Sequence, residues 1–534
     1  MSFKDLRSFI NKLEESNELT RVKTQVNPYL EISEITNRIC KGPQEKNKAI
    51  LFENVSGFQI PVLINTLGSY RRINLALGSN SFKEIGERIE KFLDKKVPDS
   101  LFGKLSMLPK LIELASFPPK LVSSAPCQEI VITDPKEPML DKLPIITAWP
   151  SDSAPFITMT VVITKDSETG IRNVGMYRLQ KINNNTTCMH WHKHHDGAQN
   201  YQEKVKQGTK QDGNLRYHPI YDSLCKEANL DDSGEHSSVK VLSKIETLDS
   251  SPIASHSRKM EVAVVIGCDP AVMYSASAPL PPGVDEFLFA GFLRSSPVEL
   301  VKCKTVDLEV PATSEIVLEG YVDLDELTTE GPFGDHTGFY SPAGFFPKFH
   351  ITAMTHRKNP VYTTIIVGKP PMEDCYMGKA TEQIFLPLIR VILPEVVDLN
   401  LPLEGVFHNC AIISIKKKYP YHARKVMNAI WGLGQLMFSK YVIVVDDDVD
   451  VHKISDVAFK VFANTDPKRD SLFTEGPTDI LDHASTVMSI SGKMGLDATR
   501  KWKSEGYTRQ WPDEMEMDIP TKELVTKKWN EYGF

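Results

Sequence analysis

The sequence contains no hydrophobic stretch that approaches the ~20 apolar residues of a membrane-spanning helix. The N-terminus also lacks the apolar run of a signal peptide and instead carries the acidic residues Asp5, Glu14, Glu15 and Glu18. We therefore expect a cytoplasmic protein, with peripheral attachment to the inner face of the cell membrane as the closest membrane contact that this sequence allows.

Cysteine is sparse and widely spaced. The chain of 534 residues has eight cysteines, and no two of them form a CxxC pair. This spacing provides neither a zinc knuckle nor a disulfide framework. It is typical of a protein that works in a reducing compartment.

The chain has no excess of positive charge. Lys and Arg total 62 against 69 Asp and Glu, which gives a formal net charge of −7. A nucleic-acid-binding protein is expected to present a basic face, so we expect no nucleic-acid partner. Three common fingerprints are missing as well, since no G-x-G-x-x-G follows a strand and neither G-x-x-x-x-G-K-[ST] nor H-E-x-x-H occurs. Dinucleotide-binding, P-loop and zincin proteins are therefore disfavoured.

Length and pattern predict a mixed α/β and β protein of three domains, because one core cannot serve so long a chain. Strand-like and helical runs alternate over residues 1–125 and again over 347–534, which predicts an α/β domain at each end and a terminal helical arm. Residues 126–346 are rich in short β-branched runs, which predict a β-barrel or sandwich. A polar segment at about 199–259 is expected to form a long insertion.

The predicted elements follow from hydrophobic spacing. Helices are expected at 3–13, 82–92, 285–294, 380–391 with a bend at Pro387, 422–439 and 522–532. Strands are expected at 50–52, 60–64, 157–164, 174–180, 186–191, 262–266, 315–322, 349–354, 361–367, 410–415 and 441–445.

The segment EGPFGDHTG (330–338) is the most informative motif. Its acids Glu330 and Asp335 flank a turn rich in Gly and Pro, which contributes little to a core and is costly to order. Such a turn usually holds its polar side chains in one arrangement. Two acids held close together can take different protonation states and so supply an acid and a base. The alternative is a surface turn with two solvated acids.

A second motif, NVGMYR (173–178), offers an amide oxygen at Asn173 and a guanidinium at Arg178. Asn is a neutral ligand for a hard cation, and Arg grips carboxylates in a bidentate manner. Because side chains alternate along a strand, these two residues serve one site only if the strand bulges or ends near Gly175. The alternative is an edge strand with a surface Arg.

Two further features contain possible metal ligands. CMHWHKHHD (188–196) places His190, His192 and His194 on one face of a strand, but such residues lie ~7 Å apart and cannot converge on one metal. One His with ligands from elsewhere is more reasonable, and a polar loop rich in His is an equal alternative. Glu286 begins an apolar helical run, where it either faces the helix dipole or acts as a partly buried ligand.

Taken together, the motifs resemble those of the UbiD family of decarboxylases. The resemblance runs from about residue 3 to the C-terminus. It is carried by NVGMYR (173–178), ELVKCKTVDLEVPATSEIVLEGYV (299–322), EGPFGDHTG (330–338), GKPPMEDCYMGKATEQIFLP (368–387), YVIVVDDDVD (441–450) and GKMGLDATRKW (492–502).

This resemblance implies a central split β-barrel that binds prenylated FMN, a cofactor made by a separate flavin prenyltransferase. It implies the non-oxidative decarboxylation of an aromatic acid, with Arg178, Glu330 and Asp335 as catalytic residues. Mn²⁺ or Mg²⁺, with K⁺ nearby, would be held at the cofactor phosphate by Asn173, His194 and Glu286. The cofactor-contacting residues implied are Met176, Tyr177, Arg178, His190, Trp191, His192, His195 and Asp196.

The resemblance also bears on the substrate and the assembly. An Asp at position 335 is similar to the quinone-pathway branch, which acts on hydroxyaryl acids that often carry a polyprenyl tail. A 4-hydroxy-3-polyprenylbenzoate of the ubiquinone pathway and a naphthoate-type precursor of menaquinone both remain open, and relatives form dimers or hexamers. We expect Asp335 to donate the proton, with its pKa raised by burial and by Glu330. Arg178 is expected to hold the substrate carboxylate or to orient Glu330.

Three alternatives remain at this point. The first is a decarboxylase of another aromatic acid outside quinone synthesis. The second is a flavin-independent, metal-dependent hydrolase that uses His190, His192, His194 and the acids. The third is a flavin-binding or assembly protein without catalysis, for which Glu330 and Asp335 would be dispensable.

Overall fold

The computed structural model describes residues 3–93, 117–166, 169–191, 259–281 and 283–533. The predicted insertion at 199–259 therefore lies outside the described residues except for Lys259. The same holds for His192, His194, His195 and Asp196. In the part of the chain that is described, no helix is both long and apolar enough to cross a membrane.

The N-terminal part is built on a four-stranded sheet in the order β1-β2-β3-β18. Its first helix is amphipathic as predicted: Asp5 caps it by accepting a hydrogen bond from the Ser8 N–H at 2.9 Å, and its apolar residues are buried. The strands are β1 (Leu19–Val22), β2 (Ala49–Phe52), β3 (Val62–Ile64) and β18 (Tyr362–Thr364). The helices are α1 (Leu6–Glu15), α2 (Glu31–Lys41), η1 (Gln44–Lys46), α3 (Tyr70–Ala76) and α4 (Phe82–Leu93).

A nine-stranded sheet forms the centre of the molecule, in the order β6-β9-β10-β17-β14-β11-β7-β8 with β5 paired to β17. Among the described strands the path is open, so the central sheet is not a closed barrel. Its strands are β5 (Ile130–Ile132), β6 (Phe156–Ile157), β7 (Thr160–Lys165), β8 (Arg172–Gly175), β9 (Leu179–Lys181), β10 (Thr186–Met189), β11 (Lys259–Ile266), β14 (Ile316–Glu330) and β17 (Gly344–His356).

Both faces of this sheet are covered. Along β11, Ala263 and Val265 belong to one buried cluster, which also contains α10 and α11, while Val262 and Val264 belong to another. The alternation is that of a strand buried on both sides. The remaining central elements are β4 (Lys120–Val122), η2 (Pro126–Gln128), η3 (Met139–Lys142), α10 (Pro270–Ser275), α11 (Glu286–Arg294), β12 (Glu299–Lys302), β13 (Glu309–Pro311), β15 (Phe333–Gly334) and β16 (Tyr340–Ser341).

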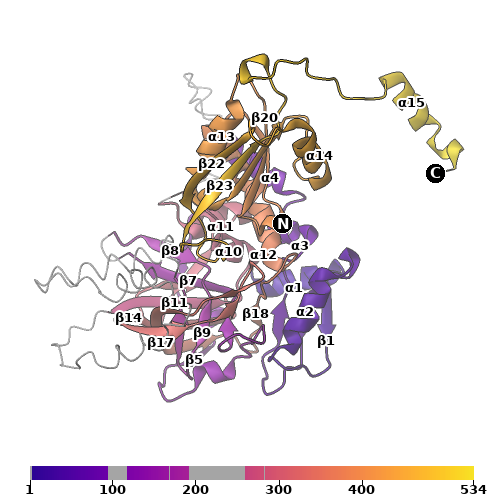
Figure 1. Cartoon of the computed structure of the whole chain (residues 1–534). Coiled ribbons are helices and arrows are strands. Elements are labelled where there is room, and N and C mark those ends of the chain that lie inside the picture. The colour runs from indigo at the N-terminus through magenta and orange to yellow at the C-terminus, as the bar shows by residue number, and fades with distance from the viewer. Residues whose placement is uncertain (1–2, 94–116, 167–168, 192–258, 282, 534) are drawn as a thin grey trace, which may run out of the picture.

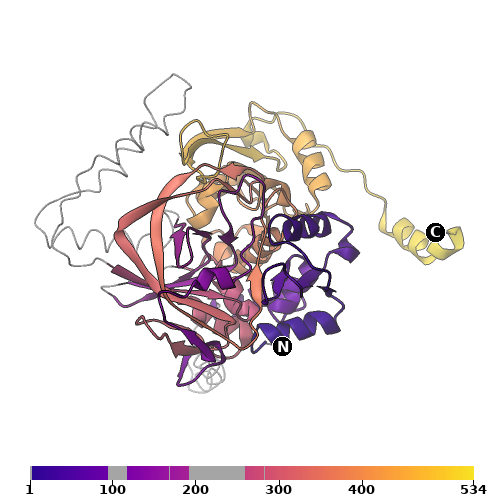
Figure 2. The ribbon, with the colours of Figure 1, turned by 90° about the horizontal axis from the view of Figure 1, so that it is seen from below.

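The C-terminal part contains a five-stranded sheet in the order β19-β20-β21-β23-β22, with α13 packed on one face and α14 on the other. Its strands are β19 (Val396–Asn400), β20 (Cys410–Ile415), β21 (Tyr441–Asp446), β22 (Ser471–Pro477) and β23 (Ile490–Asp497). Its helices are α12 (Glu373–Ile392), η4 (Leu403–Gly405), α13 (His422–Trp431), η5 (Gly434–Phe438), α14 (Ile454–Asn464), η6 (Lys503–Glu505), α15 (Ile519–Lys527) and η7 (Trp529–Tyr532). In Figures 1 and 2, α15 lies apart from the rest of the molecule.

Several predicted elements have other bounds in the structure. The strand predicted over 157–164 is divided into β6 and β7, and the strand predicted over 315–322 continues to Glu330. Helix α12 begins at Glu373 rather than at residue 380, because the helix is buried on several sides and its first turn lacks a simple apolar stripe. The helix predicted over 422–439 ends at Trp431, where Gly432 caps it. The strand predicted over 174–180 is interrupted between Gly175 and Leu179.

The predicted division into residues 1–125, 126–346 and 347–534 stays a prediction. Two strands show how closely the parts are joined. Strand β17 belongs to the central sheet and continues past residue 346, and β18 pairs in parallel with β3 of the N-terminal sheet.

Candidate active site

The break in the strand after β8 determines the position of Arg178. β8 ends at Gly175, and its backbone passes so close to Tyr177 that a Cβ at this glycine would lie 2.4 Å from the Tyr177 ring. The peptide of Arg178 is then fixed by the His190 N–H, which donates to its carbonyl at 3.3 Å. The strand thus ends at Gly175, as it must if Asn173 and Arg178 are to serve one site.

The EGPFGDHTG turn places the two acids. Glu330 is the last residue of β14, and Asp335 directly follows β15, which pairs with β16. Side chains outside the turn bind its backbone: Gln180 accepts a hydrogen bond from the Gly331 N–H at 2.7 Å, and Asp152 accepts one from the Gly334 N–H at 2.8 Å. The turn is thus held by the central sheet and does not form a solvated loop.

Arg178 binds both acids at once. Its Nε lies 2.7 Å from Glu330 Oε1 and its Nη2 lies 3.2 Å from Glu330 Oε2, while its Nη1 donates to Asp335 Oδ2. The guanidinium also lies 4.4 Å from the centre of the Phe333 ring. Glu330 is fully buried and Asp335 is 5% exposed, so the bulk solvent screens these charges weakly.

The charge of Arg178 decides the ionisation of the acids. Burial acts to raise the pKa of Glu330, but the hydrogen bond with His190 and the charge of Arg178 lower it to about 2. Burial likewise opposes ionisation of Asp335, yet Arg178 and His336 hold the pKa of Asp335 well below its usual range. The prediction of a raised pKa at Asp335 is therefore wrong for this structure, because the motif alone does not show that one guanidinium contacts both acids.

Two histidines contact the acids, and a third contacts one of these histidines. The His190 Nδ1 lies 3.0 Å from Glu330 Oε2, and burial together with the charge of Arg178 lowers the pKa of His190. His336 Nδ1 lies 2.8 Å from Asp335 Oδ1, and its Nε2 lies 2.8 Å from Nε2 of His408. The sequence pattern had indicated no role for His336 or His408. The position of His336 beside Asp335 was the only available signal, and His408 lies 72 residues further along the chain.

The chain that places one guanidinium against two buried acids is similar to known proteins over most of its length. Family models for the 3-octaprenyl-4-hydroxybenzoate carboxy-lyase match the chain in three parts: the N-terminal domain, the Rift-related domain and the C-terminal domain, at residues 10–89, 120–215 with 238–370, and 375–498. The chain belongs to the UbiD family of carboxy-lyases. An uncharacterized protein from Archaeoglobus fulgidus is 47% identical over 532 residues, which are 99% of each chain.

Solved structures of UbiD-class enzymes share the fold. Vanillic acid decarboxylase of Sedimentibacter hydroxybenzoicus in closed form superposes with a TM-score of 0.78 at 26% identity, over 99% of each chain. An evolved dimeric form of the UbiD-class enzyme HmfF from Pelotomaculum thermopropionicum, in complex with prenylated FMN, gives a TM-score of 0.74 at 26% identity, over 99% of this chain and all of the other. The predicted family and mixed α/β multidomain fold are confirmed.

The metal ligands that the UbiD resemblance implies are only partly described. Asn173 lies on β8, and its buried Nδ2 has no hydrogen-bond partner among the described residues. Glu286 Oε2 accepts a hydrogen bond from the N–H of Val174 at 3.2 Å, which brings its carboxylate beside the neighbour of Asn173. Both residues carry side-chain oxygens, which are the ligands that a hard cation prefers. Among the described residues as a whole, no three or more His, Cys, Asp or Glu side chains are placed to hold a metal ion.

The implied cofactor contacts of this UbiD-family chain divide between the two faces of the central sheet. Met176 is half-buried against the cluster that contains α10 and α11. Tyr177 and Trp191 are buried in the cluster on the other side. His190, in turn, contacts Glu330 and lies against the Phe346 ring at 4.1 Å between ring centres. These residues stay predicted cofactor contacts.

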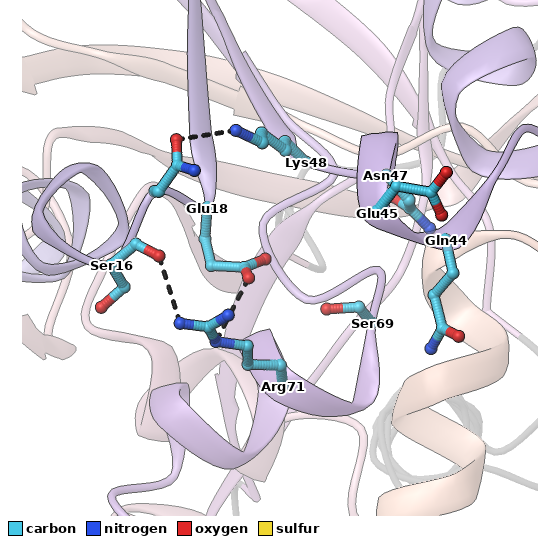
Figure 3. Close-up of a pocket in the computed structure, with 9 residues that line it drawn as sticks. Ser16, Glu18, Gln44, Glu45, Asn47, Lys48, Ser69 and Arg71 are labelled. Carbon is cyan, nitrogen blue, oxygen red and sulfur yellow. Dashed lines mark hydrogen bonds and ion pairs between the residues drawn. The ribbon is translucent and has the colours of Figure 1, made fainter.

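A cavity of about 440 Å³ lies elsewhere, in the N-terminal part (Figure 3). Its lining is polar, and Arg71 reaches across it to Glu18 at 3.3 Å and to the carbonyl of Ser16 at 3.2 Å. The residues that line it are Ser16, Asn17, Glu18, Gln44, Glu45, Asn47, Lys48, Ser69 and Arg71, so it contains none of the predicted site residues.

Proposed function

We propose that this UbiD-family enzyme removes CO2 from a hydroxyaryl carboxylic acid without net oxidation, with prenylated FMN as its cofactor, in quinone biosynthesis. The observation that carries the proposal is the nearly buried Arg178 that contacts Glu330 and Asp335 together. The likeness to a vanillic acid decarboxylase supports a phenolic acid as substrate. It equally supports the second candidate, a decarboxylase of another aromatic acid outside quinone synthesis.

The residues suggest a division of labour. Loss of CO2 leaves an electron pair on the ring carbon that no ordinary side chain can accept, and prenylated FMN, when bound, supplies that electron sink. Asp335 delivers a proton to the ring carbon. Arg178 orients Glu330 and keeps it ionised, and His190 supports Glu330 from its other side. Because these side chains are buried, their charges act with little solvent screening.

Asn173 and Glu286, with His194, are the residues that we propose to bind Mn²⁺ or Mg²⁺ at the cofactor phosphate, with K⁺ nearby. The side-chain oxygens of Asn173 and Glu286 support this assignment, because a hard cation prefers oxygen ligands. We further propose a cytoplasmic or peripheral location, a dimer or hexamer, a polyprenylated substrate and cofactor supply by a flavin prenyltransferase.

The test of this proposal is expression with and without a flavin prenyltransferase. Absorbance and mass spectrometry would identify the bound flavin, and CO2 release would be measured from hydroxybenzoates and hydroxynaphthoates. We expect modified FMN and CO2 release only with the prenyltransferase. Turnover that requires a metal but no flavin would favour the hydrolase, and the absence of both flavin and CO2 release would falsify the proposal.

Substitution of the two acids tests their assigned roles. Glu330→Gln and Asp335→Asn are expected to lower kcat by 10² to 10⁴-fold, the usual contribution of general acid–base groups. Both variants should still bind the cofactor, as seen in its absorbance spectrum. A protein that only binds flavin would instead keep its function in cells with either substitution.

A further inference from the structure

Asp335, His336 and His408 form a chain of hydrogen-bonding groups that leads away from Arg178. The Asp335 carboxylate contacts Arg178 through Oδ2 and His336 Nδ1 through Oδ1. On its other side, His336 Nε2 faces His408 Nε2 at 2.8 Å. Asp335 and His336 belong to the turn of the central part, whereas His408 lies between η4 and β20 of the C-terminal part. The contact therefore joins two parts of the molecule.

The partners of His336 fix where its protons lie. Asp335 is ionised beside Arg178, so His336 Nδ1 must donate to it. Two imidazole nitrogens 2.8 Å apart share one proton, and the question is which ring carries it. Asp335 raises the pKa of His336 to about 9, although burial opposes this, while burial and the charge of His336 lower the pKa of His408 to about 4. These charges favour His408 as the acceptor and His336 as the ring that is protonated at both nitrogens.

Groups on several elements act on this pair. Asp374 at the start of α12 and Asp479 after β22 favour the charged form of His336, and Asp479 does the same for His408. Lys440 opposes protonation of His408. The ring of Phe407 stacks on His336 with 5.3 Å between ring centres. The positive charge of the pair therefore stays on His336, between the carboxylates and away from Lys440.

The proposed reaction needs such a reserve of protons. An aryl carboxylate that loses CO2 keeps the electron pair of the broken C–C bond, and one proton per turnover must form the new C–H bond. Asp335 is the proposed donor, but at rest it is a carboxylate held by Arg178. The proton must therefore reach Asp335 from a neighbouring acid, and the group in contact with Asp335 Oδ1 is His336.

We propose that His336 stores the proton that Asp335 delivers, and that His408 is the positioning residue that keeps His336 doubly protonated. This inference rests on the proposed decarboxylation. In the step, the N–H bond at His336 Nδ1 breaks as an O–H bond forms at Asp335 Oδ1. Asp335 then gives its proton to the ring carbon and returns to a carboxylate. His336, whose side chain is 19% exposed, regains a proton from water.

Proton storage can be tested without cofactor or substrate. Histidine-labelled protein would be titrated by ¹⁵N NMR, with His336 assigned by the loss of its signals in His336→Gln. We expect His336 to titrate near pH 9 and its pKa to fall by one unit or more in His408→Leu, which removes the acceptor. His408→Gln retains a side-chain acceptor and should restore part of the shift. A His336 that titrates near its ordinary value of 6.5 in the unmodified protein would overturn the inference.

Turnover of the reconstituted holoenzyme provides the second readout. We expect His336→Gln to lower kcat about 10²-fold, the low end for general acid–base groups, with little change in KM. In His408→Leu the alkaline limb of the kcat profile should move to lower pH, and in His408→Gln it should move less. An unchanged limb in His408→Leu, or kcat within threefold of normal in His336→Gln, would contradict the role.

His483→Leu is the matched control. His483 also comes from the C-terminal part and meets the same turn, but through ring contact with Phe339 at 4.0 Å between ring centres. Its removal should leave both the His336 pKa and the kcat profile unchanged. Loss of the alkaline limb in this control would show that the pH dependence of kcat is governed by packing against the turn and not by His408. If no acid is decarboxylated at all, the proposed function fails, while the NMR titration still decides whether His336 stores a proton.

Discussion

At the scale of single residues, Arg178 determines the electrostatics of the site. It is nearly buried, and its guanidinium contacts two carboxylates that are themselves buried. Buried charges are costly unless they are paired, so removal of the arginine leaves the two acids with only their histidine contacts. The same residue that organises the proposed chemistry should therefore also stabilise the fold.

We expect Arg178→Met to lower the free energy of unfolding by about 3–5 kcal/mol at pH 8, measured by urea denaturation. The matched control is Arg38→Met, because Arg38 pairs with Glu34 at 2.7 Å on the surface of α2, where both side chains are more than half exposed. Such a pair contributes about 0.5 kcal/mol or less. Equal losses for the two variants would contradict the importance of the buried cluster.

The loss in Arg178→Met should also depend on pH. In the unmodified protein, the pKa values of Glu330 and Asp335 are lower in the folded state than in the unfolded state. The two acids therefore stabilise the fold at pH values above their ordinary pKa. This stabilisation is lost as the pH falls through the folded-state pKa, which is about 2 for Glu330. Without the guanidinium, burial raises both pKa values, and protonation then reduces the cost of the two buried charges. The stability difference should therefore be smaller at pH 5 than at pH 8.

At the scale of elements, the turn between β14 and β16 is fitted closely to its surroundings. A Cβ at Gly334 would lie 2.2 Å from Trp149 Cδ1, and the Trp149 indole is held by a hydrogen bond from its Nε1 to the carbonyl of Val367 at 2.9 Å. The indole cannot move away without breaking this bond. Gly334 therefore lets the turn approach the sheet closely enough to bring Asp335 to Arg178.

Gly334→Ala is expected to cost about 1–3 kcal/mol of stability, the usual cost of overpacking, and to lower decarboxylation by displacing Asp335. Chemical denaturation and CO2 release measure the two effects. Gly492→Ala in β23 is the control, because a Cβ there meets open space. A Gly334→Ala variant that is as stable and active as this control would show that the turn has room to adjust.

At the scale of the whole molecule, α12 connects the N-terminal sheet to the C-terminal part. Its first residue, Glu373, is buried and accepts hydrogen bonds from the Leu67 N–H at 2.6 Å and from the Thr66 hydroxyl at 3.0 Å. Burial raises the pKa of Glu373 to about 7. Burial also raises the pKa of Glu382, on the same helix, to about 7. Helix α12, which connects the two parts, therefore carries two carboxyl groups, Glu373 and Glu382, whose burial favours the neutral form.

This arrangement predicts that the protein becomes less stable as the pH rises from about 4.5 to 7. Between these pH values Glu373 is ionised in the unfolded chain but stays protonated in the folded state. The stabilisation that Glu373 gives below pH 4.5 is therefore lost as the pH rises to 7. The loss from this group is about 3 kcal/mol, since one pKa unit corresponds to about 1.4 kcal/mol. Glu373→Gln should flatten this slope in urea denaturation, whereas the exposed Glu404→Gln should not. Parallel slopes for the two variants would contradict the prediction.

The sequence by itself determined the family, the mixed α/β architecture and most strands, because hydrophobic spacing and long motifs are local properties. The need for a break near Gly175 also followed from local geometry, since alternating side chains cannot otherwise put Asn173 and Arg178 on one side. The bounds of α12 and α13 were less accessible, because caps and burial on several sides override the apolar pattern.

Only the tertiary structure decided which groups meet. Arg178 and Glu330 are in contact although 152 residues separate them along the chain, and His336 and His408 are in contact across 72 residues. A pKa depends on the charges within a few ångströms, so the ionised state of Asp335 and the charge on His336 follow from these long-range contacts. Spacing along a chain carries no record of such neighbours, which is why the motif gave the acids but not the location of the proton.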